Sequence, residues 1–351
     1  MRNILILCLC LLSACYIKPT MNKVPNLSVI DKQVLNNASY RGLGCKYDVV
    51  VFAGSNSSVY KAEVGNTKLN YLSISNNLSD SLELRDVAIL SKDTYLLMSA
   101  GEGESSQIWR TENGGKSWTK TYSAEYAKAF FDGFDFFDNK HGFLVSDPID
   151  EYLYLLETID GGKSWKRVQS KSLPKLKGKE YGFAASGSSL KCFDKNKIVI
   201  GTGGEAARLF ISEDAGASWK VQETLIQQGK TSKGIFSIDV LDNGIGIAAG
   251  GDYSIDTLAG KNIFSFNMQR NNHTMHNDVV GYKSCIKFLN NKVILTTGTS
   301  GTNLSINKGN DWKTHTELGA YHSIAFDSNN QIGFLSGAEG KICQFILNFK
   351  N

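Results

Sequence analysis

The chain has 351 residues and a formal net charge of +4, from 38 Lys and Arg residues against 34 Asp and Glu residues. A charge this small over this length excludes the strongly basic surface that nucleic-acid binding requires, so we expect no nucleic-acid partner. The length allows either two ordinary domains or one large repeat fold.

The N-terminus has the order of a bacterial secretory signal. Arg2 precedes an apolar run from Ile4 to Leu12, and small residues then lead up to Cys15. The run is shorter than the about 20 residues that a transmembrane helix needs. Residues 12–15, Leu-Ser-Ala-Cys, match the bacterial lipobox, in which the cysteine is acylated and begins the mature chain. We therefore expect residues 1–14 to be a lipoprotein signal peptide that is removed.

The lipid on Cys15 would hold an exported protein at a membrane surface of the cell envelope. The alternative is an ordinary signal peptide that is cut nearby. The sequence leaves open whether the anchored protein faces the periplasm from the inner membrane or belongs to the outer membrane. Residues 15–37 are expected to be the lipidated cysteine and a polar tether.

Four later segments follow one template: Ser or Thr, any residue, Asp or Asn, any, Gly, any, Ser, Thr or Asp, and Trp. They begin at residues 111, 158, 212 and 305, and their last position holds four of the five tryptophans of the chain. Such residues suit a tight hairpin, because Asp or Asn accepts backbone amide bonds, Gly allows positive φ, and Trp buries an apolar face. We assign these Asp boxes a structural role: Asn113, Trp118, Asp160, Trp165, Asp214, Trp219, Asn307 and Trp312.

A short apolar strand that ends in Gly or Ser recurs seven times along the chain, at residues 49–54, 95–99, 142–146, 197–201, 245–250, 293–298 and 332–337. Short strands rich in Val, Ile and Phe, separated by glycine turns, indicate an all-β protein. A repeat of about 40 to 50 residues with four strands is typical of a propeller. The prediction is a seven-bladed β-propeller of four-stranded antiparallel blades over residues 38–347.

The candidate site lies on the face opposite the Asp boxes, where the innermost strands begin and the second strands end. Loops on a rigid scaffold commonly carry binding residues. Arg41 and Arg85 are the strongest candidates, because they occupy equivalent places in consecutive blades and a guanidinium suits carboxylates or backbone carbonyls. Further partner-binding candidates on this face are Asp132, Asp147, Glu205, Arg208, Asp252, Lys283 and His322. The alternative is that these charges pair with one another and only solvate the rim.

We find no sequence pattern for a cofactor, a metal or a catalytic residue. The Gly-Lys-Ser ends of two boxes lack the earlier glycine of a phosphate-binding loop, and His273 and His276 lack a clear third metal ligand. Four cysteines remain beyond Cys15 without a CxxC pair: Cys45, Cys192, Cys285 and Cys343. Their burial as small apolar side chains is favoured over a disulfide, and any pairing stays open.

The boxes resemble those of BNR/Asp-box propellers, which include sialidases. The Arg-Ile-Pro signature of a sialidase is absent, and arginine is scarce. The chain more closely resembles the photosystem II stability/assembly factor family and its bacterial relatives, on segments such as residues 39–43, 84–87, 203–208 and 321–325. That resemblance implies a seven-bladed propeller that binds a membrane-protein client, without catalytic residues, on an arginine-lined surface to which Arg41 and Arg85 would correspond.

The leading hypothesis is therefore a membrane-anchored binding or assembly factor for a protein client. The alternatives are a carbohydrate-active hydrolase of sialidase-like type, with a glycan as ligand, and a relative labelled as an oxidoreductase without a recognisable cofactor site. A carboxylate pair at catalytic separation in the channel mouth would favour the hydrolase, and a bare, flat or basic rim would favour the binding protein. The identity of the client and the oligomeric state stay open.

Overall fold

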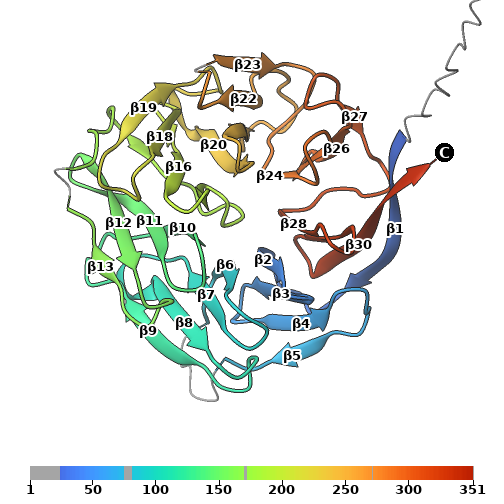
Figure 1. Ribbon diagram of the computed structural model, residues 1–351, viewed down its shortest axis with the longest axis horizontal. Coiled ribbons are helices and arrows are strands. Elements are labelled where there is room, and N and C mark those ends of the chain that lie inside the picture. The colour runs from blue at the N-terminus through green and yellow to red at the C-terminus, as the bar shows by residue number, and fades with distance from the viewer. Residues whose placement is uncertain (1–23, 75–80, 170–171, 271, 351) are drawn as a thin grey trace, which may run out of the picture.

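The computed structural model describes residues 24–74, 81–169, 172–270 and 272–350. Seven β-sheets form a closed ring around a central channel (Figure 1). The predicted seven-bladed, all-β propeller is thus confirmed. Within the described residues the structure has one short helix, the 3-10 turn η1 (Gly103–Ser105), and no helix is long and apolar enough to span a membrane.

The first four blades each contain four antiparallel strands, which are named below in order from the channel to the rim. Blade 1 contains β2 (Tyr40–Lys46), β3 (Val49–Gly54), β4 (Val59–Glu63) and β5 (Asn70–Leu72). Blade 2 contains β6 (Leu84–Ile89), β7 (Tyr95–Ser99), β8 (Gln107–Thr111) and β9 (Thr119–Ser123). Blade 3 contains β10 (Phe131–Phe136), β11 (Gly142–Ile149), β12 (Tyr152–Thr158) and β13 (Lys166–Arg167). Blade 4 contains β15 (Leu190–Phe193), β16 (Lys197–Gly201), β18 (Arg208–Ser212) and β19 (Lys220–Glu223).

The sheet of blade 5 departs from the regular pattern, because two short strands extend it to six. It contains β20 (Lys230–Val240), β21 (Ile245–Asp252), β22 (Ile263–Asn267) and β23 (Asn272–His276), together with β14 (Glu180–Tyr181) and β17 (Gly203–Gly204). Blade 6 contains β24 (Cys285–Phe288), β25 (Ile294–Gly298), β26 (Gly301–Ser305) and β27 (Lys313–Thr314). Blade 7 contains β28 (Ser323–Asp327), β29 (Ile332–Ser336), β30 (Lys341–Lys350) and β1 (Val24–Val34).

Blade 7 joins the two ends of the described chain. Strand β1 is its outermost strand and pairs antiparallel with β30, from Val24 opposite Lys350 to Val34 opposite Lys341. The expected tether over residues 15–37 therefore needs correction, because residues 24–34 belong to the propeller. Residues 15–23 lie outside the described residues. The pairing covers one edge of β30, and this closes the ring.

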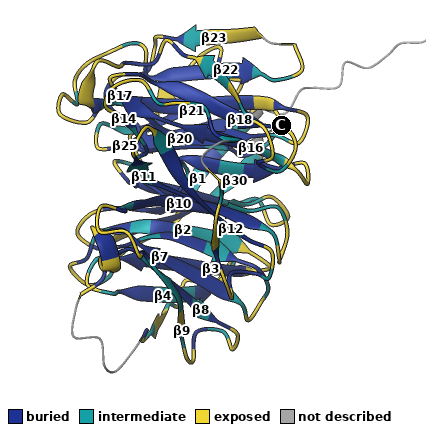
Figure 2. Cartoon of the chain, turned by 90° about the vertical axis from the view of Figure 1, so that its left-hand side faces the viewer, coloured by how far each residue is buried: buried dark blue, intermediate teal, exposed yellow. Residues whose placement is uncertain are grey.

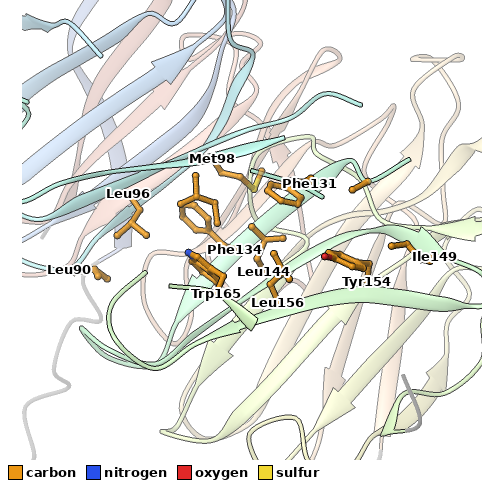
Figure 3. Packing of buried hydrophobic residues seen from close by; sticks show 13 residues of the cluster. Leu90, Leu96, Met98, Phe131, Phe134, Leu144, Ile149, Tyr154, Leu156 and Trp165 are labelled. Carbon is orange, nitrogen blue, oxygen red and sulfur yellow. The ribbon is translucent and has the colours of Figure 1, made fainter. Parts of the chain in front are cut away.

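The blades pack face to face through apolar side chains. Figure 3 shows one such core, in which Leu96 and Met98 of blade 2 lie close to Phe134, Leu144 and Leu156 of blade 3. All five are almost fully buried. Burial of one such side chain stabilises the fold by about 1.5–3 kcal/mol, so the repeated cores between blades hold the ring together.

The Asp boxes form the hairpins between the third and fourth strands. In blade 3, Thr158 Oγ1 donates to Asp160 Oδ1 (2.8 Å), and the amides of Gly162 and Ser164 donate to Thr158 Oγ1 (2.9 Å) and Asp160 Oδ1 (3.0 Å). Trp165 is buried in the core with blade 2. The side chains of this box therefore stabilise the hairpin and the core between blades, as their structural assignment predicts.

All four cysteines beyond Cys15 are free thiols in the structure. Cys192, Cys285 and Cys343 are buried, and Cys45 is half-buried. Burial raises the pKa of the Cys343 thiol to about 11 and that of Cys45 to about 12. These thiols are therefore protonated at neutral pH and serve as small apolar side chains.

Candidate functional site: the channel mouth opposite the Asp boxes

The two faces of the ring differ in what they expose. Figure 2 shows the ring edge-on, with β14 and β17 towards one face and the C-terminus at the other. Arg41 and Arg85 are the second residues of the innermost strands β2 and β6, on the face of β14 and β17. Both arginines lie at a β-bulge, between Tyr40 and Gly42 in blade 1 and between Leu84 and Asp86 in blade 2. Equivalent positions in neighbouring blades thus bring the two arginines together.

A segment of the chain blocks the channel just below these arginines. Residues 182–189, between β14 and β15, leave the ring of blades and cross the channel, and we call this segment the plug. Figure 1 shows it as a yellow-green loop that projects towards the centre of the ring. Arg41 Nη1 donates to the Ala185 carbonyl (3.0 Å), and Arg85 Nη1 donates to the Ala184 carbonyl (3.1 Å). The predicted guanidinium–carbonyl recognition occurs here within the chain itself.

Above the plug lies an open pocket of about 420 Å³. Its side is formed by four aromatic residues that contact one another, which we call the aromatic wall: Phe183, Phe236, Tyr253 and Tyr282. Phe183 stacks on Phe236 with ring centroids 3.9 Å apart, and Tyr282 meets Phe236 edge-on at 4.7 Å. Tyr253 is 53% exposed and forms the outer lip. The pocket thus joins an apolar surface to two cationic groups.

The electrostatics of the pocket are positive. Burial, and then the charge of Arg41, lowers the pKa of Arg85, yet a guanidinium stays charged at neutral pH. Burial, and then the two arginines, lowers the pKa of His322 to about 3, so this imidazole is neutral. Among the residues that the structure describes, Arg85 Nε and His322 Nδ1 have no hydrogen-bond partner. Both atoms are buried, so neither is open to an incoming ligand.

Two of the predicted carboxylates, Asp132 and Asp147, lie outside the pocket lining. Burial, and then the neighbouring Asp147, raises the pKa of Asp132 well above its usual value. Burial raises the pKa of Asp147 to about 6. A Cβ at Gly182 would lie 2.3 Å from Asp132 Oδ2, so the start of the plug rests directly on this side chain. Asp132 thus supports the plug from blade 3.

The structure gives four other candidates local partners or an outward position. Arg208 forms a buried ion pair with Glu180, with Nη2 and Oε2 2.5 Å apart. Lys283 is fully buried and donates to Ser300 Oγ (2.8 Å) and the Gly301 carbonyl (2.9 Å). Asp252 accepts bonds from Ser254, and Glu205 is exposed. None of the four lines the pocket.

Sequence reasoning missed the aromatic wall and the plug. Part of the signal for the wall was present, because Tyr282 lies just before the inner strand of blade 6 and Tyr253 follows a Gly-Gly-Asp turn. The plug has a weaker signal. Its Ala, Ser and Gly residues read as an ordinary loop, although they are nearly all buried.

A second cavity of about 330 Å³ lies below the plug, towards the Asp boxes. Lys191 pairs there with Asp135 (3.0 Å) and Lys287 pairs with Asp239 (3.3 Å), and Lys46 and the buried Asp86 also line the cavity. Within the described ranges, no group of three or more His, Cys, Asp or Glu side chains could hold a metal ion.

Comparison with known proteins shows likeness in structure only. No protein-family model and no curated protein sequence matches the chain. The structure of YCF48 bound to D1 peptide superposes with a TM-score of 0.66 at 13% identity, over 91% of this chain and 97% of that chain. YCF48 from Cyanidioschyzon merolae gives a TM-score of 0.66 at 11% identity, over 92% and 99%.

A xyloglucanase of glycoside hydrolase family 74 from Xanthomonas campestris gives a TM-score of 0.63 at 14% identity, over 90% of this chain and 53% of the enzyme. Identities this low show a common fold alone. The predicted resemblance to photosystem II assembly factors is confirmed for the propeller architecture.

Proposed function

We propose that this chain is a protein-binding propeller that holds a segment of a client polypeptide in the pocket above the plug. The observation that carries the proposal is the pairing of two guanidiniums with an aromatic wall on the face opposite the Asp boxes. Guanidinium groups recognise carboxylates and carbonyls, and aromatic side chains supply much of the energy at protein interfaces. The structural likeness to YCF48 bound to D1 peptide supports a peptide as the ligand.

The lining of the pocket also bears on the hydrolase alternative. A glycosidase normally needs two carboxyl groups that flank the bond to be cleaved. The residues that line this pocket include two arginines and four aromatics, with no Asp or Glu among them. This lining favours binding over hydrolysis.

Crosslinking in native membranes, followed by capture of the protein, tests the proposal. Arg41→Ala combined with Arg85→Ala should remove the captured client. The matched control combines Arg167→Ala with Arg270→Ala, which removes the same charge from two exposed positions away from the pocket. A client that both double variants retain would contradict the proposal.

We also propose that the protein is exported and held at a membrane by lipid on Cys15, as the lipobox at residues 12–15 predicts. Growth with an alkyne-tagged fatty acid should label the wild type and leave Cys15→Ser unlabelled and released from the membrane fraction. Equal labelling of both proteins, or a wild type free of label, would contradict the anchor and leave the peptide-binding proposal untouched.

A further inference from the structure

We propose that the plug is a positioning element of the binding site: its main chain aims the Arg41 and Arg85 guanidiniums into the pocket and thereby sets the affinity for the client. This inference rests on the proposed function, because it assumes that the two arginines bind the client. It assigns a role to residues 182–189, which have no counterpart in the four-stranded blade pattern.

The plug is fixed to several blades and is therefore able to position other groups. Ser186 Oγ donates to the carbonyl of Ser284, the residue just before the first strand of blade 6 (2.7 Å). The Ser188 carbonyl accepts the amide of Ile238 in blade 5 (2.7 Å), and Ser188 Oγ lies 2.7 Å from Ser237 Oγ. These bonds lie in a buried setting, where a lost partner is costly. The plug is thus a fixed floor for the pocket.

The two arginines depend on this floor for their position. Like charges repel, and the charge of Arg41 already lowers the pKa of Arg85. The Ala184 and Ala185 carbonyls each accept one Nη1–H and so place a negative dipole end beside each cation. A guanidinium has five N–H donors, so most of them stay available to a ligand. Without the carbonyls, each long side chain would have to be ordered when the client binds.

Gly187 offers a way to displace the plug without touching the arginines. Its φ is +71°, and a Cβ there would lie 2.2 Å from the Asp86 carboxyl group. That carboxyl group is buried and accepts the amides of Val87 (2.7 Å) and Phe134 (2.8 Å), so it cannot easily move away. Gly187→Ala should therefore shift the plug. Gly319→Ala is the matched control, because φ is +79° there and nothing lies within 4 Å of the new Cβ.

Two chemical probes report whether the plug has moved. Cys285 Sγ lies 3.8 Å from Ser188 Oγ and is 2% exposed, so a shifted plug should speed its reaction with iodoacetamide. Release of Arg41 and Arg85 should speed their reaction with phenylglyoxal. Both rates are read for each residue by peptide mass spectrometry, with all cysteines left in place. The rates should rise in Gly187→Ala and stay at wild-type values in Gly319→Ala.

The affinity of the site is measured as the yield of the crosslinked client in native membranes, over a dilution series of the protein. Gly187→Ala should require roughly tenfold more protein for the same yield, the effect expected when two side chains must be ordered on binding. Added to Arg41→Ala alone, Gly187→Ala should cause a smaller loss than it causes in the wild type, because the plug then has one arginine left to position. A merely structural effect of Gly187→Ala would cause the same loss in both backgrounds.

The outcomes separate the two proposals. A client that is lost with the arginine variants, yet captured normally by a Gly187→Ala protein whose probe rates have risen, would overturn the role of the plug and leave the proposed function standing. A client that the arginine variants retain would overturn the proposed function itself. A loss of affinity in Gly187→Ala without any rise in the probe rates would overturn the positioning role, because that loss would not act through the arginines. If Gly187→Ala does not fold, as judged by circular dichroism, Ser186→Ala removes one anchor of the plug with less strain and takes its place.

Discussion

Replacement of Arg208 by alanine should destabilise the propeller strongly, because it leaves a charge without its partner in the interior. The Arg208 side chain is 6% exposed and that of Glu180 is fully buried. Arg208 Nε donates to both carboxylate oxygens at 3.0 Å, and Nη2 donates to Oε2 at 2.5 Å. Thr202 Oγ1 also donates to Oε1 (2.5 Å). The pair ties β14, which leads into the plug, to β18 of blade 4.

Loss of one partner from a buried ion pair costs about 3–5 kcal/mol, and we expect that reduction in the free energy of unfolding. Urea titration followed by tryptophan fluorescence measures it. Glu223→Gln is the control, because Glu223 is 61% exposed and its Oε1 lies 4.0 Å from Arg208 Nη1, so its loss should cost less than about 1 kcal/mol. Arg208→Met combined with Glu180→Leu should recover much of the loss. A reduction below about 1 kcal/mol for Arg208→Ala would refute this account.

Three further predictions concern other parts of the fold. The pKa of His322 is about 3, so the folded state keeps this imidazole neutral, whereas the unfolded chain binds a proton below about pH 6.5. The contribution of His322 to the free energy of unfolding is therefore complete above about pH 6.5 and is lost as the pH falls towards 3. His322→Gln should therefore lose stability less steeply between pH 6.5 and 4.5 in urea titrations, and equal slopes would contradict this. Asp160→Ala removes the acceptor of the Ser164 amide and should cost about 1–2 kcal/mol, whereas the exposed neighbour Lys163→Ala should change the midpoint little. Deletion of residues 1–34 uncovers the edge of β30 and should lower the melting temperature and promote association in size-exclusion chromatography, whereas deletion of residues 1–23 should do neither.

The repeats were predictable because their information is local. Each Asp box holds, within eight residues, the side chains that make its own hairpin, so four boxes and seven apolar strands determine the number of blades. Strand β1 was not predictable in this way. Its partner β30 lies at the other end of the chain, and residues 24–34 contain no box and only a short apolar alternation at Leu27 and Val29. Pairing at this distance leaves no local signature.

The candidate site was predictable in part for the same reason. Equivalent positions at the start of β2 and β6 placed Arg41 and Arg85 together, and the structure brings both to one pocket. Arg208 and Lys283 carry the same charge on the same face, yet the structure buries them against local partners. Repeat register gives the blade and the face of a residue. It does not reveal whether Glu180 or solvent lies opposite the Arg208 side chain, because Glu180 belongs to β14, an insertion outside the repeat.

The position of β1 also bears on how an anchored protein would meet its client. Strand β30 runs from the pocket face to the Asp-box face, and Val24 lies opposite Lys350 at its far end. A lipid on Cys15 would join β1 through residues 16–23, which span at most about 30 Å when fully extended. The anchor would thus join the propeller at the Asp-box face, opposite the pocket. A pocket on the face away from the attachment point would leave the arginines and the aromatic wall open to segments of a client that project beyond the bilayer, such as a terminus or an exposed loop.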